Sequence, residues 1–157
     1  MAKVTRATAA LAKAGANFTV HSYAYDPGAD RIGMQATAAL GEPPARVLKT
    51  LMVLLDGKPA CAILPSDAEV VMKKLAAALG GKSAEMMKPA DAERVTGFKV
   101  GGISPFGQMR RVPTAIEAAA LDQPYVFVNG GQRGLQVRLD PADAARILDA
   151  RVASIVA

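Results

Sequence analysis

Lys49 is the side chain whose type and position most directly suggest chemistry. It precedes the apolar run at residues 50–55, so its aliphatic stem can be buried while its ammonium group points into a cleft. By position alone, the simpler interpretation is a solvated lysine at the end of a strand, because charged residues are rarely buried. A role for Lys49 therefore needs support from other residues.

Two glycine-rich runs could offer backbone N–H groups to a carbonyl or phosphate oxygen. The first is Gly-Gly-Ile-Ser-Pro-Phe-Gly at residues 101–107, and the second is the pair Gly130-Gly131. Adjacent glycines allow close approach to the backbone and positive φ angles. Hairpin turns need glycine for the same steric reason. Arg110, Arg111 and Arg133 follow these runs and could contact a phosphate backbone, although isolated arginines are usually only solvated.

The supply of side chains argues against a catalytic triad and against a metal site. His21 is the single histidine and Cys61 the single cysteine, and they lie in separate segments without a nucleophile elbow. A zinc ion would need several further ligands. Cys61 lies in an apolar run, where a buried thiol acts as a small hydrophobic group. We expect no metal and no cofactor.

The segments that must position these residues alternate between helical and extended patterns. In the first third of the chain, the sequence predicts a helix after Thr5 that ends at Gly15, a strand at residues 18–23, a turn at residues 26–28, a helix at residues 32–40 closed by Gly41, and a short segment from Pro43 to Val47. The strongest local signal follows: two apolar runs, residues 50–55 and 59–64, joined by Asp56-Gly57 as in a hairpin.

The rest of the chain continues this alternation. Ser66 to Glu69 matches a capping box and predicts a helix that ends at Gly80-Gly81. Further extended segments are expected at residues 84–87, 112–116, 125–129 and 135–139, with helices opened by Pro89 and by Asp140-Pro141. This order predicts an α/β protein, a single domain over residues 1–157, with a mixed, largely antiparallel sheet. Neither a dinucleotide fingerprint nor a phosphate-binding loop is present in the required spacing.

The composition and net charge limit the classes of molecule that the protein is expected to bind. The chain has 157 residues, with 51% hydrophobic and 21% charged, which is typical of a globular protein and excludes disorder as its main state. A net charge of +5 suits an anionic partner such as RNA, but 4% aromatic residues and no Trp argue against base stacking on single strands. No apolar run approaches the roughly 20 residues of a membrane span, and Lys13 interrupts the N-terminal apolar stretch, so we expect a cytoplasmic protein.

Five motifs in chain order resemble the YbaK family of aminoacyl-tRNA deacylases. They are His21-Ser22-Tyr23, Asp26-Pro27, Val47-Leu48-Lys49-Thr50-Leu51, Val100-Gly101-Gly102-Ile103-Ser104-Pro105-Phe106-Gly107 and Asn129-Gly130-Gly131-Gln132-Arg133-Gly134-Leu135. The resemblance spans nearly the whole chain. It implies a freestanding editing domain, similar to the insertion domain of bacterial prolyl-tRNA synthetases, that hydrolyses cysteine wrongly attached to tRNA(Pro). It also implies that the sheet is barrel-like and surrounded by helices.

The resemblance places catalytic roles on Lys49 and Tyr23. An aminoacyl ester is already activated, so positioning and hydrogen-bond donors lower the barrier without a covalent catalyst. Lys49 would contact the terminal ribose, phosphate or carbonyl, amides of residues 101–103 would hold the ester oxygen, and the substrate's own thiol would attack the carbonyl and release a thiolactone. The expected substrate-binding residues are Ile32, Thr50, Gly101, Gly102, Ile103, Ser104, Pro105, Asn129, Gly130 and Gly131.

Four positions differ from well-known relatives and leave the amino-acid preference open. Asn129 replaces a small hydroxyl residue and Gln136 an acid, while Tyr25 replaces a histidine and Ile32 an aromatic ring. The alternatives are a deacylase for Ala-tRNA(Pro) or another small residue, and a noncatalytic module that holds a tRNA end. The expected partners are aminoacyl-tRNA, in particular tRNA(Pro), and prolyl-tRNA synthetase, with no membrane and no DNA.

Overall fold

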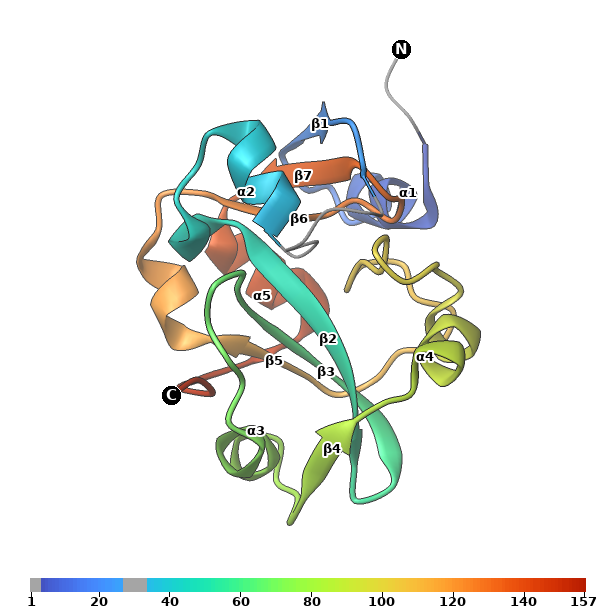
Figure 1. Cartoon of the computed structure of the whole chain (residues 1–157), viewed down its shortest axis with the longest axis vertical. Helices are drawn as coiled ribbons and strands as arrows, with labels where there is room; N and C mark the ends of the chain where they lie inside the picture. The colour runs from blue at the N-terminus through green and yellow to red at the C-terminus, as the bar shows by residue number, and fades with distance from the viewer. Residues whose placement is uncertain (1–3, 27–33) are drawn as a thin grey trace.

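The computed structural model describes residues 4–26 and 34–157, whose strands form two β-sheets (Figure 1). One sheet is antiparallel, with the order β1 (Phe18–Ser22), β7 (Leu135–Leu139), β6 (Val126–Asn129). The other has the order β4 (Ala84–Met86), β2 (Leu48–Leu55), β3 (Lys58–Pro65), β5 (Thr114–Glu117), β8 (Arg151–Ala153). In that sheet β3–β5 and β5–β8 are parallel pairs and the others are antiparallel.

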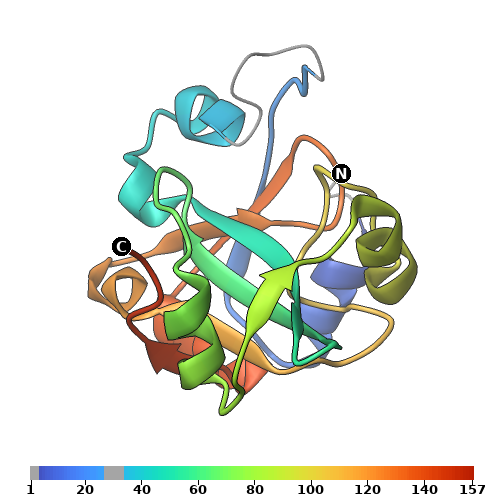
Figure 2. The same cartoon turned by 60° about the horizontal axis from the view of Figure 1, so that its bottom comes forward.

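Short helices surround the two sheets, as Figures 1 and 2 show from two directions. The α-helices are α1 (Arg6–Lys13), α2 (Gln35–Leu40), α3 (Met72–Ala78), α4 (Pro89–Thr96) and α5 (Pro141–Leu148), and the 3-10 helices include η2 (Pro44–Arg46) and η3 (Ala118–Asp122). Thr5 caps α1 through a capping box, and the Asp140 side chain accepts from the Ala142 amide at the start of α5, as the sequence predicts.

The predicted α/β class and the mixed, largely antiparallel pairing are confirmed, but a barrel is not. Within the described residues, the two sheets are connected by a bridge between Val47, just before β2, and Phe127 on β6. The bridge lies at the β6 edge, and closure would require the other edge strands, β1, β4 and β8, to find further strand partners, but each of them has one neighbour in its sheet. The structure is therefore two open sheets that are joined by one bridge and pack over a shared hydrophobic core.

The hairpin predicted at Asp56-Gly57 is present as β2 and β3. Both turn residues have positive φ, 50° for Asp56 and 83° for Gly57, which is the geometry that a two-residue hairpin favours. The backbone N–H groups of Lys82 and Ser83 donate to the Asp56 carboxylate and lower its pKa. The same contacts connect the hairpin turn to the segment that leads into β4.

The capping box predicted at Ser66 is wrong. Helix α3 begins six residues later, at Met72. The Ser66 hydroxyl is instead buried and hydrogen-bonds the Thr37 hydroxyl at 3.0 Å, which connects it to α2. The Val71 N–H donates to the Ile155 carbonyl at 2.8 Å. A tertiary contact with the C-terminal segment therefore replaces the extra helical turn.

Cys61 is buried in β3, as predicted, with 1% of its surface exposed. Burial raises the pKa of its thiol to about 12, and a weaker opposing effect comes from a hydrogen bond with Thr114. A thiol protonated in this way is a poor nucleophile at neutral pH. The structure supports a packing role for Cys61.

Candidate active site

A pocket of about 270 Å³ lies where the two sheets meet. Its walls come from the start of β2, the ends of β1, β6 and β7 or the residues next to them, the loop around Gly101, and the segment between β4 and α4. The lining residues are Tyr23, Tyr25, Ala36, Val47, Leu48, Lys49, Thr50, Leu51, Met52, Met86, Met87, Pro89, Ala92, Val100, Gly101, Ile103, Asn129 and Gln136.

The pocket brings together part of the residue set predicted from the sequence. The members that line it are Tyr23, Lys49, Thr50, Gly101, Ile103 and Asn129. The members that lie outside its lining are Gly102, Ser104, Pro105, Gly130 and Gly131. Ile32 falls outside the described residues. Sequence reasoning left out of its site Tyr25, Gln136 and three methionines, Met52, Met86 and Met87, that also line the pocket.

Lys49 is the second residue of β2, opposite Leu64 on β3. Its side chain is half-buried and lines the pocket. Within the described part of the chain, no ion pair holds its ammonium group and no Asp or Glu lines the pocket. The ammonium group is therefore available to an anionic or carbonyl oxygen of a ligand.

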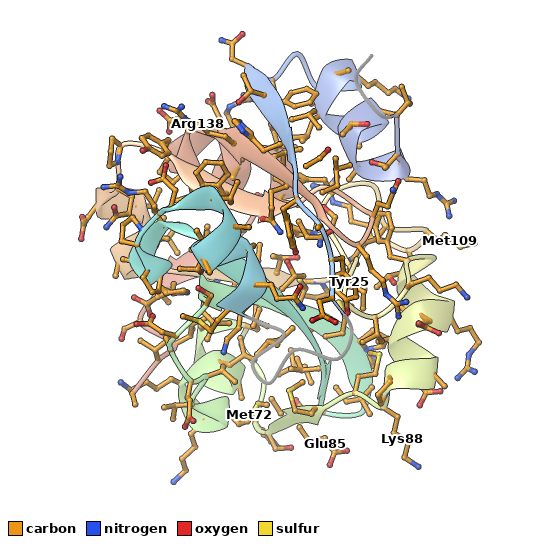
Figure 3. The ribbon with its side chains drawn as sticks, turned by 45° about the horizontal axis from the view of Figure 1, so that its top comes forward. Tyr25, Met72, Glu85, Lys88, Met109 and Arg138 are labelled. Atoms are coloured by element: carbon orange, nitrogen blue, oxygen red, sulfur yellow. The ribbon has the colours of Figure 1, made fainter. Side chains whose placement is uncertain are left out.

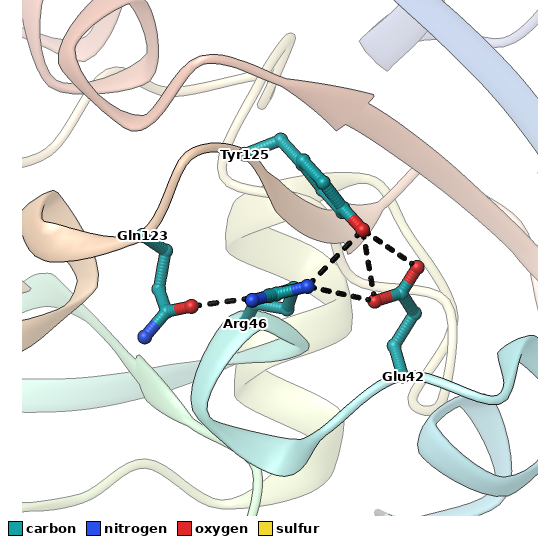
Figure 4. A network of polar contacts seen from close by, with 4 residues as sticks. All are labelled: Glu42, Arg46, Gln123 and Tyr125. Atoms are coloured by element: carbon teal, nitrogen blue, oxygen red, sulfur yellow. Dashed lines mark hydrogen bonds and ion pairs between the residues drawn. The ribbon is translucent and has the colours of Figure 1, made fainter.

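A polar network holds the turn that leads to Lys49 (Figure 4). Arg46 in η2 donates to Gln123 Oε1 at 3.0 Å, to Glu42 Oε1 at 3.3 Å and to the Tyr125 hydroxyl at 3.1 Å. The Arg138 guanidinium, on β7, lies 3.8 Å from the centre of the Tyr125 ring. Because these residues come from separate segments, the network fixes η2 against the three-stranded sheet and so sets the direction in which β2 begins.

Asn129 connects the two glycine runs. Its Nδ2 donates to the Gly101 carbonyl at 3.2 Å, and its Oδ1 accepts from the Gly131 N–H at 2.7 Å. Arg133 adds a second connection, since its Nε donates to the Val100 carbonyl at 2.8 Å and its guanidinium lies 5.5 Å from the Tyr25 ring centre. The loop around Gly101 is thus held by side chains from the β6–β7 turn.

The backbone N–H groups of the glycine runs divide into two kinds. In the first kind the N–H group has an acceptor: Gly102 donates to the Lys99 carbonyl, Gly130 to the Leu135 carbonyl and Gly131 to Asn129 Oδ1. Those of Gly101 and Ile103, two pocket-lining residues, have no acceptor within the described residues. Among the loop amides without an acceptor in the described residues, these two belong to residues that line the pocket, so they are the candidates for binding a ligand oxygen.

The second half of the glycine run turns away from the pocket. Ser104 is fully buried, and its hydroxyl oxygen accepts from the Phe106 N–H at 3.2 Å. Pro105 lines a different cavity, of about 340 Å³, together with residues of α1 and α5. Ser104 and Pro105 therefore support the loop from behind.

Tyr23 and Tyr25 follow β1 into the pocket, and Figure 3 shows Tyr25 in the interior of the view, whereas Lys88 and Met109 lie at its outer surface. Burial raises the pKa of the Tyr23 hydroxyl, while a hydrogen bond with the Gln136 side chain lowers it by less. Tyr23 is therefore protonated at neutral pH. It can donate a hydrogen bond to a ligand, but it cannot act as a base.

Two structural findings bear on other classes of site. Among the residues described, no group of three or more His, Cys, Asp or Glu side chains is placed to hold a metal ion. In the same part of the chain, every helix is too short or too polar to cross a membrane.

The arrangement can position and polarise an activated acyl group. Lys49, Tyr23 with its protonated hydroxyl, and Gly101 and Ile103 with their unpaired amides all line one largely apolar pocket, and the described lining offers no Cys, Ser or carboxylate as a nucleophile. Such donors stabilise a developing oxyanion without a covalent intermediate.

The comparisons agree with this class of site. A model of the aminoacyl-tRNA editing domain family matches residues 26–147. The chain belongs to this family, which confirms the resemblance found in the sequence. Its reaction class is the deacylation of mischarged aminoacyl-tRNA.

Individual relatives agree as well. The chain is 32% identical, over 80% of its length and 78% of the relative, to an Enterococcus faecalis (strain ATCC 700802 / V583) protein that carries the name Cys-tRNA(Pro)/Cys-tRNA(Cys) deacylase EbsC. A solved structure described as a trans-editing enzyme for prolyl tRNA synthetase superposes with a TM-score of 0.84 at 22% identity, over 97% of this chain and 95% of that one. The latter likeness supports the fold.

Proposed function

We propose that the protein removes cysteine from Cys-tRNA(Pro) in trans. The name of the Enterococcus faecalis relative supports the amino acid and the tRNA. The observation that carries the chemistry is the placement of Lys49 in one pocket with Gly101 and Ile103, whose N–H groups have no acceptor within the described residues. An ester carbonyl held there meets donors where negative charge develops.

The proposed reaction uses the substrate's thiol as the nucleophile. The sulfur forms a bond to the ester carbonyl carbon, and the bond from that carbon to the ribose oxygen breaks. The thiol proton passes to the ribose oxygen, so the products are a thiolactone and free tRNA. The amides of Gly101 and Ile103 hold the carbonyl oxygen, Lys49 binds a phosphate or ribose oxygen, and the protonated Tyr23 hydroxyl donates to the ester.

The remaining site residues act through this geometry. Asn129 positions the loop through its bonds to Gly101 and Gly131, and Gly102, Ser104, Pro105 and Gly130 shape and support it. Ile32 is proposed as a side chain next to the amino-acid group. A cytoplasmic location and an association with prolyl-tRNA synthetase complete the proposal, since an editing enzyme acts where the tRNA is charged.

The test is deacylation of Cys-tRNA(Pro) beside Ala-tRNA(Pro) with wild type, Lys49→Ala and the control Lys58→Ala. Lys58 is an exposed lysine at the start of β3 and lies outside the pocket. We expect wild type and Lys58→Ala to deacylate Cys-tRNA(Pro) alike, and Lys49→Ala to lose about a hundredfold or more in rate, the scale of a lost transition-state donor.

Other results have distinct meanings. Preferred loss of alanine would move the protein to the alanine-specific class and refute the proposed substrate. Stoichiometric tRNA binding without turnover would indicate a noncatalytic module. A folded Lys49→Ala protein with full activity would remove Lys49 from the mechanism.

A further inference from the structure

Two buried polar atoms in the pocket have no hydrogen-bond partner in the part of the chain that the structure describes. Within the described residues, Thr50 Oγ1 and Gln136 Oε1 are the buried side-chain oxygens or nitrogens that lack a hydrogen bond, and both residues line the same pocket. Gln136 is 4% exposed, so bulk water does not readily replace a partner. Buried polar groups are nearly always hydrogen-bonded, and leaving one unpaired is costly. Two such atoms in one cavity indicate a polar group of the ligand.

Thr50 and Gln136 lie on the two strands that flank β6. The bridge between Val47 and Phe127 sets the start of β2 beside β6, and Gln136 on β7 lies opposite Asn129 on β6. Thr50 and Gln136 therefore line the same pocket from the strands on either side of β6.

The chemistry of the two atoms selects the group. Gln136 Oε1 can only accept a hydrogen bond, because its amide nitrogen carries the donors and the side chain hydrogen-bonds Tyr23. The Thr50 hydroxyl can also accept. A neutral amine has two N–H donors and can satisfy both oxygens, whereas a thiol or a hydroxyl has one hydrogen and a thiol is a weak donor. The acceptors are uncharged and Lys49 lines the same pocket, which favours a neutral donor over a second cation.

We propose that Thr50 and Gln136 together bind the α-amino group of the aminoacyl ester, which donates one N–H to Thr50 Oγ1 and one to Gln136 Oε1. This inference rests on the proposed function, because it assigns a group of that substrate to one wall of the same pocket. It makes Thr50 and Gln136 specificity-determining residues for an α-amino acid. They distinguish an aminoacyl ester from an acyl ester that lacks the amine.

The test combines protein variants with a substrate that lacks the amine. Single-turnover rates are measured for Cys-tRNA(Pro) and for 3-mercaptopropionyl-tRNA(Pro), which retains the thiol and the ester. The variants are Thr50→Val, Gln136→Met and the conservative Thr50→Ser. Thr19→Val serves as the matched control, since Thr19 is exposed on β1 and lies outside the pocket.

We expect Thr50→Val and Gln136→Met each to lower the rate on Cys-tRNA(Pro) by roughly five- to tenfold, the value of one net hydrogen bond, and to change the rate on the deamino substrate little. Thr50→Ser should restore most of the Cys-tRNA(Pro) rate. The deamino ester differs in intrinsic reactivity, but that difference is the same for every protein variant. It cancels when the variant-to-wild-type rate ratio on one substrate is divided by the same ratio on the other. Thr19→Val should match wild type on both substrates.

Equal losses on both substrates would overturn the inference, because the variants would then act on something other than the amine. A second measurement keeps the test valid without turnover: the Kd of 3′-cysteinylamino-3′-deoxyadenosine against its deamino analogue. Losses of affinity for 3′-cysteinylamino-3′-deoxyadenosine that disappear for its alanyl analogue would also overturn the inference and assign the pair to the thiol. If wild type leaves Cys-tRNA(Pro) intact, the proposed function fails, while equal Kd values for the two analogues would refute the amine site alone.

Discussion

Lys49 supplies the positive charge of the pocket. Every other described lining residue is neutral at pH 7, so the ammonium charge is not cancelled by a carboxylate in that part of the chain. Its position on a strand matters, because the ladder to Leu64 fixes the backbone and leaves only the side chain to adjust. A cation held in this way attracts the phosphate and the oxyanion of an aminoacyl ester, and it repels a second cation.

Cys61 provides a prediction at the residue scale. Its pKa rises from 9.0 to about 12 because the thiol is buried, so the folded protein keeps it protonated while the unfolded chain ionises above pH 9. The stability that this thiol contributes is fully present below pH 9 and is lost as the pH rises toward 12. We expect the free energy of unfolding to fall by about 1.4 kcal/mol more per pH unit in wild type than in Cys61→Ala.

Urea unfolding at several pH values between 9.0 and about 12 measures this slope. Other groups titrate in the same range, but their contribution is shared by wild type and Cys61→Ala and cancels in the difference. Pulsed alkylation at pH 8 is an independent check, since the native thiol should resist and the unfolded thiol should react. Parallel stability curves for the two proteins would contradict the assignment of the buried thiol.

The pocket-lining residues that the sequence predicted share one property: they lie in contiguous motifs. Lys49 and Thr50 are neighbours in the chain, and Gly101 and Ile103 belong to one run. Gln136 lines the pocket because β7 pairs with β6 and β6 lies beside the start of β2, and no local pattern encodes that arrangement. The sequence showed that Gln136 stands where a relative has an acid, but it did not predict that Gln136 lines the pocket.

At the scale of elements, the glycine loop supports a matched comparison. Gly101 has φ +88°, and a Cβ there would lie 2.7 Å from the Tyr25 hydroxyl, whereas Gly57 has φ +83° and nothing within 4 Å. Alanine at either position should cost about 1–2 kcal/mol of stability, because both residues are in the left-handed region. Only Gly101→Ala should also displace Tyr25 and lower the deacylation rate.

Thermal unfolding and single-turnover deacylation of Gly101→Ala and Gly57→Ala separate the two effects. Assays at a temperature where both variants are folded exclude loss of active protein as the cause. If Gly57→Ala lost as much activity as Gly101→Ala, the loss would reflect general destabilisation, and the contact with Tyr25 would have no specific role.

Elements whose signals are local were predicted correctly, and those set by distant contacts were not. Asp56-Gly57 needs only its own positive φ angles to form the hairpin. Ser66 has the pattern of a helix cap, yet its hydroxyl bonds Thr37 and the helix begins at Met72. Strand β8 was not predicted, because Arg151–Ala153 is short and is held by parallel pairing to β5.

At the scale of the whole molecule, the pocket depends on how the two sheets meet. The bridge from Val47 to Phe127 brings the start of β2 beside β6, and the lining residues come from both sheets. The sequence predicted the fold class and the hairpin of β2 and β3, but not that the sheets stay open, because closure depends on twist and on which edges find partners. The single domain over residues 1–157 stays a prediction.

The net charge of +5 leads to a prediction about the tRNA partner. Contacts between Lys or Arg and phosphates release counterions, so KM for Cys-tRNA(Pro) should rise steeply when salt increases from about 50 to 200 mM. Aminoacylated adenosine lacks the tRNA phosphates but retains the ester, so its KM should change little over the same range. Measuring kcat and KM for both substrates in a salt series checks this, with kcat expected to stay constant because the chemistry occurs inside the pocket. Equal salt slopes for the two substrates would show that the pocket alone carries the binding energy and that the positive surface contributes no contacts to the body of the tRNA.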